Sequence, residues 1–220
     1  MLLIPPLDAA GQMALDEAAL NLVPEGSGFL RFYAWAGRAV TFGLAQPFSL
    51  AEALAKDRGM AGVPIVRRPT GGGVVFHDGD FTFSVIFPWE RLTSALGVYE
   101  CMHLAVRQGL AARGMETVVA GPGAAADACF DAPSPFDLVL PDGRKLMGGA
   151  LRRRAGKGLY QGSLRPELCG LQTEELRKAV VAGIRDKWPC PWIDAPQPAW
   201  LAEAGTLAAK YRSDDWNRRR

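Results

Sequence analysis

The chain of 220 residues is long enough to bury a sizeable core, and 49% of its residues are hydrophobic, so we expect one large domain. Its 25 basic and 23 acidic side chains give a formal net charge of +2, too weak a bias to indicate a nucleic acid or an anionic membrane surface as partner. Gly, Pro or charged residues interrupt every apolar run before the roughly 18 residues of a spanning helix, and the start MLLIPPLDAAGQ lacks a basic segment. We therefore expect a cytoplasmic protein.

Four cysteines are scattered along the chain without a CxxC pair, namely Cys101, Cys129, Cys169 and Cys190. This spacing indicates neither a zinc cluster nor a disulfide framework. We predict no metal site and at most one chemically important thiol.

Periodic apolar residues from Gly11 to Leu22 predict an opening helix. The stretch FLRFYAWAGRAVTFGLAQ is rich in aromatic and β-branched residues and predicts two strands joined by a turn at residues 36–38. A third strand is expected at residues 65–68, and the alternating residues 80–88 predict a fourth.

The second half of the chain predicts a helix at 92–113, a strand at 116–120, a long loop AGPGAAADACFDAPSP, strands at 136–140, 144–147 and 158–164, and a helix at 173–187. Long loops in compact domains are usually functional. Strands and helices come in mixed order without βαβ repeats, which favours an α+β fold over a doubly wound α/β fold.

The most informative motif is VRRPTGGGVVFHDGDFTFSV at residues 66–85. Consecutive glycines let a backbone approach a ligand closely and turn its N–H groups toward phosphate or carboxylate oxygens. Arg67 and Arg68 would add charged donors to the same anion. A glycine-rich bulge or hairpin turn with surface arginines explains the same residues, although His77 and Asp78 add polar side chains at the same end of the predicted sheet.

A second motif is GRKLMGGALRRRAGKGLYQGSL, in which Lys145 lies in a short apolar strand ahead of a glycine pair. A lysine that points inward can neutralise a phosphate, polarise a carbonyl or act as a base, whereas on an edge strand it is solvated. The run Arg152–Arg154 is typical of a solvated face or hairpin end, with a contact to an acidic partner surface as the alternative. The stretch GPGAAA at residues 121–126 mimics a dinucleotide fingerprint, but no βαβ unit surrounds it and Pro122 removes a backbone donor.

Together, RRPTGGGVVFHDGDFTFSV, KLMGGA and GLYQGSL resemble the signature segments of the lipoate–protein ligase and octanoyltransferase superfamily, which includes the biotin ligases. The resemblance runs from MALDEAAL through AVTFGLAQP to LAAKYRSDDWN and covers nearly the whole chain. It implies an α+β fold with a mixed β-sheet flanked by helices. We expect a single catalytic domain over residues 1–220, without a C-terminal accessory domain.

The resemblance also implies the residues of the site. Lys145 matches the lysine that acts at the acyl carbonyl or phosphate. The expected lining of an acyl or acyl-adenylate pocket comprises Gly43, Gln46, Arg68, Gly71, Gly72, Gly73, His77, Gly148, Gly149 and Ala150. The N–H groups of residues 71–73, or those of residues 148–149, are alternative donors to a developing oxyanion.

Two branches of the superfamily activate the acyl group differently. Ligases use ATP and Mg and commonly carry an Asn-Asp pair before the lysine strand, where this chain has Phe136 and Asp137. Transferases carry octanoyl on a cysteine, and Cys129 in ACFDAPS resembles their nucleophile, with an inert loop thiol as the alternative. Cys169 lies where another transferase branch keeps its cysteine, but its surroundings do not match. Lys145 is the group that the resemblance offers to activate the Cys129 thiol.

The sequence thus favours a cofactor-free octanoyltransferase over an ATP- and Mg-dependent ligase. The transferase interpretation implies an acyl carrier protein as donor and a lipoyl-domain protein as acceptor; the ligase interpretation adds a separate accessory protein. A non-catalytic acyl-binding module is a third interpretation, which intact Lys145 and Gly73 disfavour. We expect no nucleic-acid partner, because no helix-turn-helix segment precedes the domain and the net charge is near zero.

Overall fold

A large mixed sheet forms the centre of the computed structural model, which describes residues 5–89, 93–121 and 133–219. The sheet has seven strands in the order β10-β1-β5-β9-β8-β7-β6, antiparallel except for the parallel pair β1 and β10. These strands are β1 (Gly28–Phe32), β5 (Phe81–Pro88), β6 (Val118–Val119), β7 (Leu138–Val139), β8 (Lys145–Arg154), β9 (Lys157–Leu164) and β10 (Trp192–Ile193). The order of strands confirms the predicted α+β fold with a mixed sheet.

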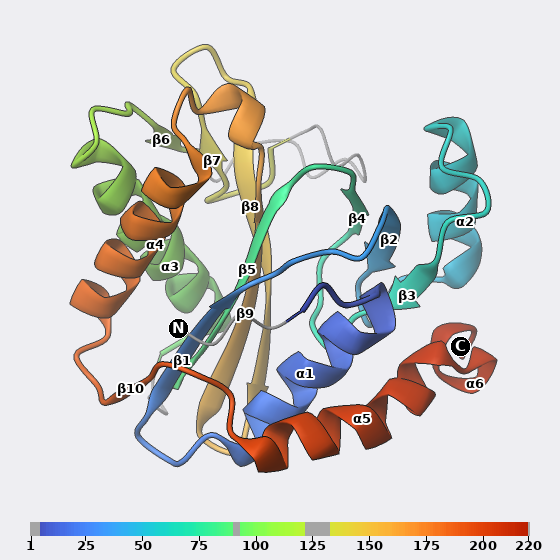
Figure 1. Ribbon diagram of the computed structural model, residues 1–220. Coiled ribbons are helices and arrows are strands. Elements are labelled where there is room, and N and C mark those ends of the chain that lie inside the picture. The colour runs from blue at the N-terminus through green and yellow to red at the C-terminus, as the bar shows by residue number, and fades with distance from the viewer. Residues whose placement is uncertain (1–4, 90–92, 122–132, 220) are drawn as a thin grey trace.

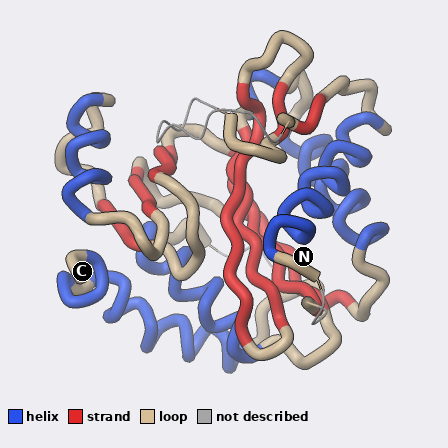
Figure 2. Tube along the Cα trace, turned by 180° about the vertical axis from the view of Figure 1, so that it is seen from behind, coloured by secondary structure: helices blue, strands red, loops and turns tan. Residues whose placement is uncertain are grey.

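Helices cover both faces of this sheet (Figure 1). They are α1 (Ala9–Leu22), α3 (Ala95–Ala111), α4 (Thr173–Lys187) and α5 (Pro198–Arg212), followed by the short α6 (Asp214–Asn217). Helices α3 and α4 lie on one face and α1 and α5 on the other, and the view from behind in Figure 2 shows the same layers. Helices α3 and α4 approach closely because of glycine: a Cβ on Gly109 would lie 1.9 Å from the carbonyl oxygen of Ala179.

Strand β5 lies at the centre of the core and is buried on both faces. Phe83, Val85 and Phe87 pack with residues of α3 and α4, whereas Ile86 packs with residues of α1 and α5. The strand was predicted correctly, but its alternation does not mark a solvent-exposed face, because helices cover both sides of it.

A smaller sheet stands beside the large one, with three strands in the order β3-β2-β4. They are β2 (Ala39–Phe42), β3 (Ile65–Arg67) and β4 (Val74–His77), and helix α2 (Phe48–Asp57) packs on this sheet through a separate apolar cluster. The strands predicted in FLRFYAWAGRAVTFGLAQ are β1 and β2. They do not form a hairpin, since each joins a different sheet.

The first helix carries a buried carboxylate that the apolar pattern of the sequence does not reveal. Asp16 is fully buried and accepts hydrogen bonds from Arg31 at 2.8 Å, from Ser84 at 2.7 Å and from Gln161 at 2.6 Å, as well as from the Tyr33 hydroxyl. These donors come from β1, the residue after β1, β5 and β9, so one carboxylate joins α1 to the sheet.

Among the residues that the structure describes, no helix is both long and apolar enough to span a lipid bilayer.

The buried pair of Asp16 and Arg31 yields a prediction about stability. Arg31→Met should lower the free energy of unfolding by about 3 kcal/mol, because it leaves a buried carboxylate without its cationic partner. Urea denaturation measures this change. The matched control is Arg212→Met, whose pair with Asp8 at 2.9 Å is exposed and should contribute little. Equal unfolding midpoints for Arg31→Met and the unaltered protein would contradict the prediction.

Candidate acyl-transfer site

Residues of both sheets line one cavity of about 560 Å³. Most of the residues expected at the site lie there, namely Gln46, Arg68, Gly71, Gly72, Gly73, His77, Lys145, Gly148, Gly149 and Ala150. Gly43 is not among the described lining residues. Its place is behind the wall, where a Cβ would come within 1.9 Å of the carbonyl oxygen of Gly72, so Gly43 lets β2 approach the loop of residues 71–73, here called the glycine loop.

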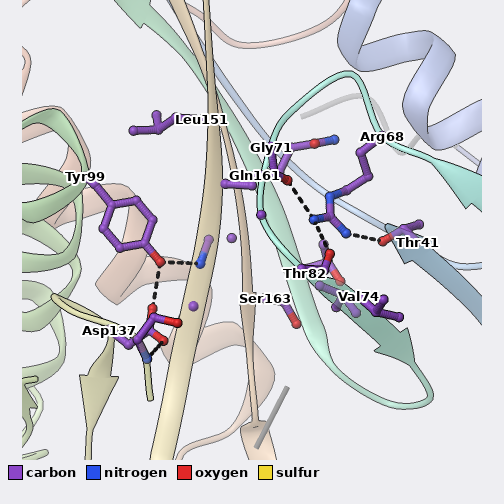
Figure 3. A pocket seen from close by; sticks show the side chains of 18 of the residues that line it. Thr41, Arg68, Gly71, Val74, Thr82, Tyr99, Asp137, Leu151, Gln161 and Ser163 are labelled. Atoms are coloured by element: carbon purple, nitrogen blue, oxygen red, sulfur yellow. Dashed lines mark hydrogen bonds between the residues drawn. The ribbon is translucent and has the colours of Figure 1, made fainter. Parts of the chain in front are cut away.

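Lys145 forms the charged centre of one wall. Its Nζ lies 2.8 Å from Oδ2 of Asp137, whose side chain is only 1% exposed. Asp137 also accepts the hydroxyl of Tyr99 at 2.6 Å and the backbone N–H of Ser134 at 2.8 Å. A carboxylate so deeply buried requires such donors. The lysine therefore lines the cavity with a fixed anionic partner, Asp137, which Figure 3 labels beside Tyr99.

The residue before Asp137 has a strained backbone. Phe136 has a φ of 68°, in the left-handed region that glycine and asparagine tolerate best. Its N–H donates to the carbonyl oxygen of Ala120 at 2.9 Å, and the N–H of Ala120 donates to the carbonyl oxygen of Asp137 at 2.8 Å. Strain of this kind persists only where the surroundings impose it, and it is found disproportionately at functional sites. Here it accompanies the turn that directs Asp137 at Lys145.

Arg68 holds the opposite wall together. Its guanidinium donates to the Thr41 hydroxyl at 3.0 Å and to the carbonyl oxygens of Gly71 and Gly73, both at 2.9 Å (Figure 3). Burial lowers the pKa of Arg68 to about 10, so the side chain is still charged at neutral pH. Arg68 thus fixes the shape of the glycine loop in addition to facing the cavity.

Arg67 has a different role from the predicted one. Its guanidinium donates to the carbonyl oxygens of Leu44 and Gln46 and to those of residues 216, 217 and 219 near the C-terminal end of the described chain. The hypothesis that Arg67 joins Arg68 at an anion is therefore wrong. Arg67 attaches the C-terminal segment to the glycine-loop side of the fold.

His77 closes a wall of the cavity with both ring nitrogens engaged. Nε2 lies 2.8 Å from Oγ1 of Thr41, Nδ1 lies 2.9 Å from Oδ2 of Asp80, and the ring stacks on Trp35 at 4.0 Å between centroids. Burial raises the pKa of Asp80, but the charge and hydrogen bond of His77 and the hydroxyls of Ser163 and Thr82 outweigh it, so the net pKa is lowered. Asp80 is thus an ionised anchor for the histidine.

Three of the four cysteines, Cys101, Cys169 and Cys190, lie within the described residues. Cys129 lies outside the described residues. Of the other three, none is among the described residues that line the cavity, and burial, with a contribution from Glu167, raises the pKa of Cys169 to about 12. A thiol with so high a pKa is a poor nucleophile at neutral pH.

Some cavity residues had no signal in the sequence. Tyr99, Thr41 and Gln161 lie in ordinary helix and strand patterns, and their contacts become visible only once distant segments pack together. Asp137 had a partial signal, since it follows the long loop and precedes the lysine strand.

The fold is that of a class of catalytic domains, the lipoate-protein ligases of known structure. Residues 8–196 match the family described as the lipoyl protein ligase A/B catalytic domain, and the chain belongs to this family. The predicted superfamily resemblance is thereby confirmed.

Relatives known by sequence are octanoyltransferases. Octanoyltransferase LipM of Macrococcus caseolyticus is 34% identical over 168 residues, which cover 69% of this chain and 60% of the relative. Its counterpart in Exiguobacterium sibiricum is 28% identical, with 97% of this chain and 96% of the relative covered. The chain thus spans about 60% of the length of the first of these relatives.

Solved structures with the same fold are ligases. Lipoate-protein ligase A bound with ATP superimposes with a TM-score of 0.80 at 22% identity, covering 99% of this chain and 97% of the other. A bi-partite lipoate protein ligase from Thermoplasma acidophilum gives 0.78 at 23% identity, covering 99% and 94%. At these identities the likeness establishes the fold.

Two residues of the glycine loop, Gly72 and Gly71, should differ in how well they tolerate substitution by alanine. Gly72 has a φ of 82°, and a Cβ there would lie 3.2 Å from Nη2 of Arg68 and 3.3 Å from Cβ of Ala150. Gly72→Ala should therefore destabilise the protein by about 1–2 kcal/mol. Gly71→Ala is the matched control, because its Cβ would meet nothing within 4 Å. Chemical denaturation of the two variants measures the difference, and equal stabilities would show that the loop relaxes freely.

Proposed function

We infer that this chain is an acyltransferase of protein lipoylation, which moves an octanoyl or lipoyl group through a thioester on Cys129 to the lysine of a lipoyl domain. The family, and the octanoyltransferases related to the chain by sequence, support this function. An acyl carrier protein is the proposed donor and a lipoyl-domain protein the proposed acceptor.

The observation that carries the proposal is the Lys145 ammonium, held by buried Asp137 at the wall of an otherwise largely apolar cavity. Val74, Val75 and Leu151 contribute apolar surface suited to an acyl chain. A cation at this point stabilises the thiolate that attacks and the negative charge that develops on the acyl oxygen.

The reaction proceeds in two balanced steps. The Cys129 thiol loses its proton, the resulting thiolate attacks the donor thioester, a new thioester forms on the enzyme, and the carrier thiolate leaves and takes up that proton. The acceptor lysine amine then attacks this thioester, the amide forms, and the proton lost by the amine restores the Cys129 thiol. Since thioester exchange is nearly isoenergetic and amide formation is downhill, neither step needs ATP.

The glycine loop is the better of the two predicted sources of oxyanion donors. The N–H of Gly149 already donates to Tyr99 at 3.0 Å, and Gly148 is registered opposite Ser163 in the β8–β9 ladder. In the loop, the N–H of Gly71 is bonded to the carbonyl oxygen of Leu151. We therefore assign the oxyanion to the N–H groups of residues 72–73.

The second candidate function is an ATP-dependent ligase acting through lipoyl-adenylate. The contacts of Asp137 do not favour the ligase function. Its carboxylate already contacts the Lys145 ammonium, the Tyr99 hydroxyl and the N–H of Ser134. Asp137 so engaged does not fit the role of a Mg ligand. In the ligase interpretation, Lys145 would chiefly bind phosphate and carbonyl oxygens.

The proposal predicts an acyl-enzyme. Octanoyl carrier protein alone should leave a hydroxylamine-sensitive adduct on the peptide containing ACFDAPS, detected by intact mass and peptide mapping. Cys129→Ser should lose both the adduct and turnover. Lys145→Ala should lose turnover while the protein still folds, with a lowered unfolding midpoint because the buried Asp137 carboxylate loses its cationic partner.

Cys169→Ser is the matched control and should retain full activity, since this thiol lies away from the described cavity lining. If Cys129→Ser remains active, and product forms only from free acid with ATP, the ligase function replaces the transferase.

A further inference from the structure

The hydroxyl of Tyr99 connects three elements beside Lys145. Tyr99 is carried by α3, and its hydroxyl donates to Oδ1 of Asp137 at 2.6 Å and accepts the N–H of Gly149 at 3.0 Å. Figure 3 shows the bond between Tyr99 and Asp137. Gly149 belongs to β8, the strand that begins with Lys145. One hydroxyl therefore links the carboxylate that holds the lysine to the strand that carries it.

We propose that Tyr99 is a positioning residue of the site, which acts through Asp137 to keep the Lys145 ammonium directed at the cavity. The proposal rests on the proposed function, in which Lys145 acts at the acyl group.

The geometry of the carboxylate explains why the hydroxyl is needed. The terminal torsion of an aspartate is soft, so a carboxylate held at one oxygen can still turn. Oδ2 of Asp137 contacts both Lys145 and the N–H of Ser134, each at 2.8 Å, whereas Oδ1 accepts the Tyr99 hydroxyl. Removing the hydroxyl leaves the second oxygen without this donor and lets the carboxylate plane rotate away from the lysine.

The surroundings of Tyr99 keep it a permanent donor. Burial, followed by the charge of Asp137, raises the pKa of the Tyr99 phenol well above its ordinary value. Its ring lies 4.2 Å from that of His103, whose Nε2 is 2.7 Å from the Tyr160 hydroxyl. Burial lowers the pKa of His103 to about 4, so this ring is uncharged at neutral pH. Tyr99 therefore orients Asp137 without exchanging a proton with the substrate.

A double-mutant cycle of Tyr99→Phe and Asp137→Asn tests the proposal on octanoyl transfer. Tyr99→Phe keeps the ring on His103 and should lower kcat about tenfold or more, the scale of a hydrogen bond to a charged group, with KM for the acyl donor unchanged. Asp137→Asn should be slower still. Because Tyr99 acts through Asp137, the double variant should be no slower than Asp137→Asn alone. Additive losses would overturn the proposal.

The matched control is Tyr160→Phe, which removes a fully buried hydroxyl bonded to His103 rather than to Asp137. It should lower Tm while kcat is unchanged. An equal drop in kcat for Tyr160→Phe and Tyr99→Phe would show that loss of any buried hydroxyl here lowers activity by destabilising the fold. That result would overturn the proposal.

A second measurement does not depend on acyl transfer. Acetic anhydride labels exposed amines, and peptide mass spectrometry reports the labelling of Lys145. Tyr99→Phe should raise this labelling, because the carboxylate that shields the amine can turn away, and Tyr160→Phe should not. If the unaltered protein transfers no acyl group, the proposed function fails while the labelling still decides the role of Tyr99. Equal labelling in all three proteins would overturn that role.

Discussion

The buried carboxylate of Asp16 determines how the first helix, the large sheet and the glycine loop meet. A charge inside a protein is tolerated only when donors surround it, and those of Asp16 come from Arg31 on β1, Ser84 on β5 and Gln161 on β9. Gln161 extends the connection, since its amide oxygen accepts the hydroxyl of Thr70, the residue directly before the three glycines. The placement of the glycine loop therefore follows from hydrogen bonds between distant segments as well as from apolar packing.

Local patterns in the sequence predicted many of the helices and strands but not which strands pair with one another. Helix α4 has the predicted bounds, and strands β3 and β5 lie close to the predicted residues 65–68 and 80–88. Helices α2 and α5 and strand β4 were not predicted. Strands β1 and β2 read as neighbours because they are close in sequence, yet β2 pairs with β3 and β4. Such non-local pairings depend on contacts that no single window of sequence contains.

Those site residues that the sequence itself makes conspicuous could be predicted. Those that reach the site only because distant segments pack together could not. Glycines and Lys145 stand out in the sequence, whereas Tyr99 meets Asp137 from 38 residues away and Gly149 from 50. The neighbouring residues Arg67 and Arg68 show how far prediction from the sequence reaches. Successive residues of an extended chain point to opposite sides, so one arginine faces the cavity and its neighbour binds the C-terminal segment.

The two walls of the cavity are held in place by different kinds of contact. Backbone contacts determine the width of the cavity, and side-chain contacts determine where its charged lysine lies. On the glycine side, backbone contacts set the width: Gly43 allows β2 against the loop, Gly71 donates to Leu151 of β8, and Arg152 donates to the carbonyl oxygen of Pro69. On the other side, the position of Lys145 is set by its contact with Asp137 directly before β7. The two walls therefore depend on different segments, the glycine loop on one side and the residues before β7 on the other. The backbone contacts of the glycine loop set the width of the cavity, and the hydrogen bonds of Asp137 set the position of its lysine.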